Sequence, residues 1–125
     1  MATQRVFVYG TLLKGERNHA LLQGATLCGS HRTVPIYRLF HLGNYPGVRP
    51  GGQSAILGEV YCIDGRILRA LDRLEAYPRV YTRKLIPTPW GVAWIYLYQE
   101  EGSRARQIPS GDWRGQGRQL GVFRL

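Results

Sequence analysis

Apolar residues in this chain fall into short continuous or alternating runs, a pattern that predicts mostly strands. Apolar, β-branched residues at 6–8 predict a buried strand. Similar patterns predict strands at 25–34, 36–42, 54–63, 80–87 and 92–98, with a hairpin turn at 88–91. Along 92–98 both alternating sets of side chains are apolar, as in the sheet of a small barrel that is covered on both faces.

Residues 64–76 predict the main helix. Asp64 is the expected N-cap, and Pro78 ends the helix because the residue before a proline avoids the helical conformation. Apolar residues recur on one helix face and arginines on the opposite face. The apolar residues are Ile67, Leu68, Leu71 and Leu74. One or two further helical turns are predicted at 16–23. Strands followed by one main helix and more strands favour an α+β fold with a mostly antiparallel or mixed barrel.

Glu75 continues the apolar face of the predicted helix, because it follows Leu71 by four residues. A carboxylate in that position is partly desolvated, which raises its pKa. Such a group is a general base that can return its proton near neutral pH. The alternative is that Glu75 lies in the last helical turn and points outward to pair with Arg79 or Arg83.

The predicted strand at 6–8 ends at a glycine turn. Gly10 allows the backbone to turn where a Cβ atom would obstruct it. A turn after a buried strand can direct several backbone N–H groups at one point, which suits an anion or a developing oxyanion. A purely structural turn is the alternative.

Two later segments have less regular patterns. Residues 43–52 are dense in turn formers and predict a loop, which is either a plain connection or the rim of a pocket. Residues 108–113 are predicted to be structured, with Trp113 as an anchor. Residues 114–125 are predicted as a flexible tail, since apolar residues are sparse over 114–121.

The 125 residues are predicted to form one domain spanning 1–125 with a single core. No run approaches the length of a membrane span, and no signal peptide precedes the first strand, so a cytoplasmic protein with no membrane partner is expected. Cys28 and Cys62 are expected to be reduced and buried. The three histidines form no ligand motif, so no metal is implied.

The formal net charge is +9, from 17 Lys and Arg against 8 Asp and Glu. The cations are scattered, so three roles stay open: a solvated surface, contact with nucleic acid, and attraction of an anionic substrate. Nucleic-acid binding would need Trp94, Tyr96 and Tyr98 on an exposed face among arginines. Their alternation with apolar residues favours a core, so no specific nucleic-acid partner is expected.

Several short motifs resemble one family. The sequences VFVYGTL at 6–12 and KGERNH at 14–19 are similar to the opening of gamma-glutamylcyclotransferase-like proteins, and are closest to the gamma-glutamylamine cyclotransferase branch. The sequences GEVY at 58–61, LDRLEAYP at 71–78 and YTR at 81–83 match later landmarks of that family in order. The sequence SGDW at 110–113 resembles small bacterial members, many of them uncharacterised.

The resemblance implies a small mixed β-barrel with flanking helices and a cavity at one end. It implies that the backbone of Tyr9, Gly10, Thr11 and Leu12 holds the gamma-glutamyl part of a small-molecule substrate. It assigns Glu75 as the catalytic residue, and Tyr81, less directly, as a residue that lines the cavity.

The implied reaction is attack by the substrate's own α-amino group on its side-chain carbonyl, which yields 5-oxoproline and expels an amine or amino acid. This chemistry needs no cofactor or metal, because the nucleophile is tethered and one carboxylate can move the proton. Not every small bacterial member keeps the glutamate. Two alternatives therefore stay open: a non-catalytic binding or regulatory protein, and a basic nucleic-acid-binding module. The leaving group and the oligomeric state are not predicted.

Overall fold

The computed structural model describes residues 3–100 and 105–115. Residues 113–115 are helical, and the remaining described elements are one α-helix, one 3-10 helix and eight strands. In chain order these are β1 (Gln4–Val8), η1 (His19–Leu22), β2 (Thr26–Arg32), β3 (Tyr37–His41), β4 (Pro46–Pro50), β5 (Leu57–Ile63), α1 (Gly65–Leu74), β6 (Tyr81–Ile86), β7 (Ala93–Tyr98) and β8 (Arg106–Gln107).

The strands form two sheets, so the fold is mixed α+β as predicted. One sheet has five strands in the order β2-β5-β1-β7-β6, in which only β1 and β7 are parallel. The other has three strands in the order β4-β3-β8. Within the described residues the sheets do not close, because β3 and β4 pair with each other and not with β2 or β6. The predicted barrel is therefore not confirmed.

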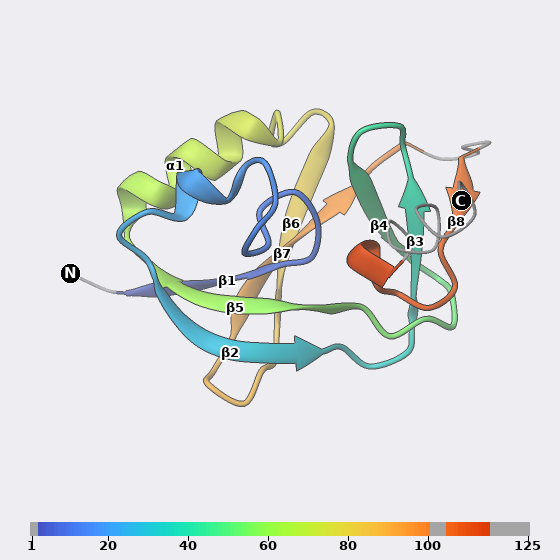
Figure 1. Ribbon diagram of the computed structural model, residues 1–125, viewed down its shortest axis with the longest axis horizontal. Coiled ribbons are helices and arrows are strands. Elements are labelled where there is room, and N and C mark those ends of the chain that lie inside the picture. Colours follow the sequence, from blue (N-terminus) through green and yellow to red (C-terminus); the bar gives the residue numbers. More distant parts are fainter. Residues whose placement is uncertain (1–2, 101–104, 116–125) are drawn as a thin grey trace.

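The five-stranded sheet is covered on both faces, as the alternation along 92–98 predicts. Figure 1 shows α1 lying along this sheet, with β3, β4 and β8 grouped at the other side of the molecule. Val6 and Val8 pack with the buried residues of α1. Phe7 points to the opposite face and packs with Leu39 and Val48 from the three-stranded sheet. Strand β1 thus contributes to both halves of the core, which positions its C-terminal end between them.

Helix α1 begins where the sequence predicts but ends two residues earlier. The Asp64 side chain accepts a hydrogen bond from the Ile67 N–H at 2.9 Å, which confirms the N-cap. The helix ends at Leu74 because Ala76 adopts a positive φ of 50°. Ile67, Leu68 and Leu71 of the predicted apolar face are buried, whereas Leu74, at the end of the helix, is 39% exposed.

Two local predictions need correction. The loop predicted at 43–52 contains strand β4, whose prolines lie at its two ends on a sheet edge. Proline has no backbone N–H group to donate. An edge strand tolerates it because no neighbouring strand on the outer side needs that hydrogen bond. The helix predicted at 16–23 is reduced to η1, because tight turns occupy the preceding residues, with Glu16 N–H bonded to Leu13 O and His19 N–H bonded to Glu16 O.

Three further expectations can be compared with the structure. The hairpin turn at 88–91 is confirmed by reciprocal backbone hydrogen bonds of 3.1 Å between Thr88 and Gly91. Trp113 packs against the core and stacks with His41 at 5.2 Å between ring centroids. The cysteines are not fully buried: they are half-buried on the neighbouring strands β2 and β5, with the two Sγ atoms 3.5 Å apart.

Residues 116–125 of the predicted flexible tail lie outside the described residues. Among the described helices, none is both long enough and apolar enough to cross a membrane.

Candidate active site

The turn after β1 presents a row of unpaired backbone donors. Leu13 N–H closes the turn by donating to Gly10 O at 3.0 Å. Within the described residues, the N–H groups of Gly10, Thr11 and Leu12 donate to no protein acceptor. A Cβ atom at Gly10 would overlap the ring of Pro46, so only glycine allows the turn to pack against β4. Consecutive unpaired N–H groups of this kind can bind an anionic oxygen.

A second loop segment holds the turn in place. Asn18 N–H donates to Thr11 O at 2.8 Å, and the Asn18 amide donates to Thr11 Oγ1 at 2.9 Å. The His19 ring nitrogen Nδ1 donates to Leu12 O at 2.9 Å. Because Thr11 Oγ1 already accepts a hydrogen bond from Asn18, its own hydroxyl proton is free to be donated to a bound molecule.

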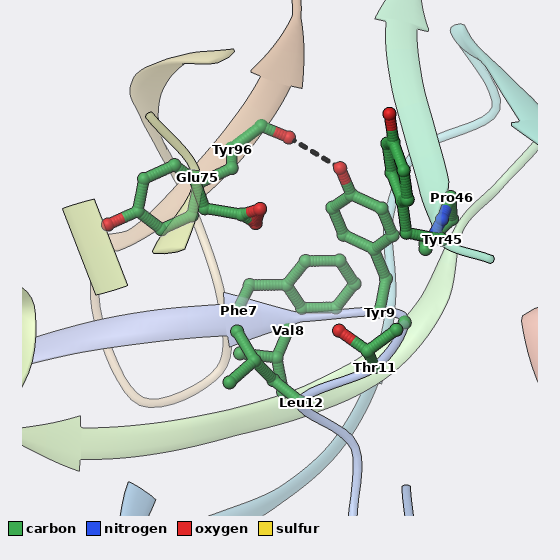
Figure 2. Close-up of a pocket in the computed structure, with 10 residues that line it drawn as sticks. Phe7, Val8, Tyr9, Thr11, Leu12, Tyr45, Pro46, Glu75 and Tyr96 are labelled. Atoms are coloured by element: carbon green, nitrogen blue, oxygen red, sulfur yellow. Dashed lines mark hydrogen bonds between the residues drawn. The ribbon is translucent and has the colours of Figure 1, made fainter. Parts of the chain in front are cut away.

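Glu75 faces this turn across a recess. It lies just after the last residue of α1, and its carboxylate points into the recess (Figure 2). Within the described residues the carboxylate has no hydrogen bond and no ion pair. Desolvation by burial raises the pKa of Glu75 to about 7. Glu75 and the glycine turn therefore line the same recess, as the roles that the resemblance assigns to them require, and the alternative in which Glu75 pairs with Arg79 or Arg83 is wrong.

The neighbouring carboxylate, Asp72, takes the arginine instead. Arg83 donates to both Asp72 oxygens, at 2.9 and 3.1 Å, and the Tyr96 hydroxyl donates to Asp72 Oδ1 at 2.6 Å. The Arg83 guanidinium also stacks on Tyr77 at 4.5 Å and Trp94 at 4.3 Å. This network joins α1, β6 and β7 directly beside Glu75 and leaves the Glu75 carboxylate without a counter-ion.

The cavity has two connected parts. The inner recess has a volume of about 30 Å³ and is lined by Phe7, Val8, Tyr9, Gly10, Thr11, Leu12, Tyr45, Pro46, Glu75 and Tyr96. The outer hollow has a volume of about 270 Å³ and is lined by Thr11, Arg17, Asn18, Tyr45, Leu74, Glu75, Ala76, Val80 and Tyr81. Thr11, Tyr45 and Glu75 line both parts, so the two adjoin at these three residues.

Both predicted tyrosines are in the cavity wall, but their hydroxyls are already paired. The Tyr9 hydroxyl donates to Tyr96 O at 2.8 Å, and the Tyr81 hydroxyl donates to Pro46 O at 2.6 Å. Burial raises the pKa of both phenols above the ordinary value, so both stay neutral at physiological pH. Glu75 is therefore the lining residue suited to exchange a proton near neutral pH.

The described residues contain no group of three His, Cys, Asp or Glu side chains that could hold a metal ion.

A family model described as gamma-glutamyl cyclotransferase, AIG2-like, matches residues 6–115. The chain belongs to this family. A Vibrio cholerae protein provisionally named gamma-glutamylcyclotransferase is 52% identical over 108 residues, which cover 86% of this chain and 93% of that protein. Human gamma-glutamylaminecyclotransferase is 39% identical over 90 residues, which cover 65% of this chain and 59% of the human protein.

Solved structures agree with this membership. An uncharacterised Pyrococcus horikoshii protein superposes with a TM-score of 0.80 at 27% identity, covering 95% of this chain and 97% of that one. The solution structure of an Escherichia coli protein has a TM-score of 0.74 at 40% identity, covering 91% of this chain and 99% of that one.

Sequence reasoning missed several residues that line the cavity of this gamma-glutamyl cyclotransferase family member. Asn18 was noticed only inside the KGERNH motif, and Tyr96 only as a core residue. Tyr45 and Pro46 belong to the 43–52 segment, for which a pocket rim was one of two readings. A proline beside a glycine of another segment gives no local signal, because the contact forms only when β4 reaches the turn.

Proposed function

We propose that this protein is a cyclotransferase that converts a gamma-glutamyl compound into 5-oxoproline and a free amine or amino acid. The substrate's α-amino nitrogen attacks the side-chain carbonyl carbon, so one carbon–nitrogen bond forms and closes a five-membered ring. The bond from that carbon to the leaving nitrogen breaks. Because the nucleophile and the carbonyl belong to the same molecule, the protein's main task is to hold the folded conformer.

Glu75 is proposed to move the proton. Its carboxylate takes a proton from the substrate's α-ammonium group, which frees the nitrogen for attack. The same carboxyl then gives that proton to the leaving nitrogen. The attacking nitrogen loses a second proton as the ring closes, and this proton passes to the released amine or to water, so Glu75 ends as it began. A pKa of about 7 suits both steps, because the group accepts and releases protons with similar ease at neutral pH.

The glycine turn is proposed to bind the gamma-glutamyl half. The unpaired N–H groups of Gly10, Thr11 and Leu12 can donate to the substrate's α-carboxylate or to the oxyanion that develops during attack. Asn18 preorganises these donors by holding both the backbone and the side chain of Thr11. Tyr81 is proposed only as a wall of the outer hollow, since its hydroxyl is bonded to Pro46.

The observation that most supports this proposal is the unpaired, half-buried and desolvated Glu75 facing three unpaired backbone donors. A purely structural carboxylate at this position would gain stability by pairing with Arg83, as Asp72 does. An isolated buried carboxyl is instead unfavourable for stability, and is common where proton transfer is required. Membership in the family and the names of the relatives point to the same reaction.

The test is turnover of a panel of gamma-glutamyl compounds, scored by release of 5-oxoproline. α-Glutamylalanine is the matched control for γ-glutamylalanine, because its peptide bond cannot break by this ring closure. Release from γ-glutamyl compounds alone supports the proposal. Saturable binding of the panel without any release would contradict catalysis and favour the binding-protein alternative.

The nucleic-acid alternative receives less support from the aromatic residues. Tyr96 is buried, and the Trp94 ring is stacked against the Arg83 guanidinium. These rings do not form the exposed stacking face that base recognition needs. We expect any nucleic-acid binding to be weak, independent of base sequence and removed by salt.

A further inference from the structure

The outer hollow adjoins the proposed reaction centre but lies outside the glycine turn. It meets the inner recess at Thr11, Tyr45 and Glu75. If the gamma-glutamyl half occupies the recess against the turn, the leaving nitrogen lies near Glu75, which must protonate it. The rest of the leaving group then extends into the outer hollow. This inference therefore rests on the proposed function, and concerns which leaving group the hollow accepts.

Few charged residues line the hollow. Among the described residues that line it, Arg17 is the only one besides Glu75 with a formal charge. Its side chain is exposed, and within the described residues the guanidinium has no hydrogen bond or ion pair. The remaining lining residues are neutral, so the wall offers no second carboxylate to a cationic leaving group.

Arg17 also lies close in the chain to the groups that define the reaction centre. The next residue, Asn18, is hydrogen-bonded twice to Thr11, which fixes the backbone of this segment against the glycine turn. In an amino-acid leaving group, the α-carboxylate is attached to the carbon next to the scissile nitrogen. It therefore enters the hollow close to the inner recess, and Arg17 is a cation among the residues that line this hollow.

We infer that Arg17 binds a carboxylate of the leaving group, so that the preferred substrates are γ-glutamyl amino acids or peptides and not γ-glutamyl derivatives of simple amines or polyamines. A guanidinium offers several N–H donors in a planar fork that matches a carboxylate. A polyamine leaving group would place a second cation beside Arg17 on a protein whose formal net charge is +9.

The experiment uses two substrates that differ only in the carboxylate. γ-Glutamylalanine and γ-glutamylethylamide share the gamma-glutamyl half, and ethylamine is alanine without its carboxyl group. We expect kcat/KM for γ-glutamylalanine to be about tenfold higher, the size of one charge-assisted hydrogen bond. Arg17→Gln brings this ratio close to one. The matched control Arg66→Gln removes an equal charge from the exposed face of α1, and keeps the ratio.

The outcomes separate this inference from the proposed function. Release of 5-oxoproline from both compounds with equal kcat/KM, or a preference that survives Arg17→Gln, overturns the role of Arg17 alone. A ratio that falls equally in Arg66→Gln shows that net charge, not Arg17, is responsible, and also overturns it. If neither compound is turned over, the proposed function fails. The affinities of the two compounds for wild type and for Arg17→Gln are then measured by calorimetry. A preference for γ-glutamylalanine that Arg17→Gln removes supports the role of Arg17, and equal affinities overturn it.

Discussion

Two carboxylates stand three residues apart at the end of α1, in opposite surroundings. Asp72 accepts hydrogen bonds from Arg83 and Tyr96, and its side chain is 20% exposed. Glu75 faces the recess, has no partner within the described residues, and has a pKa raised to about 7 by desolvation. One short helical segment thus contains a paired carboxylate and an unpaired one.

The difference separates a group that links elements of the fold from one that is suited to proton transfer. A paired carboxylate holds elements together, and removing one partner leaves the other charge uncompensated. An unpaired, desolvated carboxylate adds no such link but exchanges protons near neutral pH. Because Arg83 is occupied by Asp72 and stacked between two aromatic rings, it cannot neutralise Glu75. The network therefore leaves the Glu75 carboxylate without a counter-ion.

The largest expected effect comes from Glu75→Gln. Glutamine nearly matches glutamate in size, so the fold and substrate binding should survive, but it cannot accept the ammonium proton. We expect kcat to fall by about 10,000-fold or more, at or beyond the upper end for general acid–base catalysis. The measurement is 5-oxoproline release, together with ligand affinity and thermal stability. The exposed Glu100→Gln serves as the matched control. More than about a tenth of the wild-type rate in Glu75→Gln would show that Glu75 is not the base.

The pH dependence of the rate tests the same residue without a mutation. Glu75 must be ionised to accept a proton, and its pKa is about 7, so kcat/KM should rise with pH and level off above that value. Between pH 7, where about half of Glu75 is ionised, and pH 5 we expect a fall of about 50-fold, approaching tenfold for each pH unit at the acidic end. An acidic limb centred instead near the ordinary glutamate value would show that Glu75 is not desolvated in solution.

Asp72→Asn should lower stability more than turnover, which is the reverse of the effect expected for Glu75→Gln. Arg83 would keep its charge without a carboxylate partner, so the free energy of unfolding should fall by about 2–3 kcal/mol. We expect kcat to fall by about tenfold or less, through displacement of the helix end, with the acidic limb still near 7. Chemical denaturation and steady-state kinetics measure both. Loss of turnover with unchanged stability would mean that the two carboxylates have exchanged roles.

A smaller effect is expected in the pH dependence of stability. The pKa of Glu75 is higher in the folded state than in the unfolded chain, so the folded state binds more protons between those two values. The contribution of protonated Glu75 to the free energy of unfolding is therefore complete below the pKa of the unfolded chain, and it is lost as pH rises through about 7. We expect a loss of about 1–2 kcal/mol, since the recess opens to water. The measurement is the difference in Tm between wild type and Glu75→Gln from pH 4 to pH 8. This difference should change with pH by the expected loss, and a difference that does not depend on pH would contradict the prediction.

Local features of the candidate site could be predicted from the sequence. The N-cap at Asp64 and the helical spacing place Glu75 on the buried side of α1, because both depend on residues within two helical turns. A turn at position 10 follows from the abrupt end of a buried strand. Alternation along 92–98 predicts a sheet covered on both faces, because side chains of a strand alternate whatever its neighbours are.

Only the tertiary structure decided which carboxylate Arg83 pairs with. By sequence spacing alone, either Asp72 or Glu75 could pair with Arg83. The register of β6 against β7 selects Asp72, because it places Arg83 opposite Tyr96, whose hydroxyl is bonded to Asp72. The contact of Pro46 with Gly10 and the position of Arg17 in the outer hollow likewise join segments distant in the chain. Periodicity reports which way a side chain faces, whereas strand register and loop docking determine what it meets there.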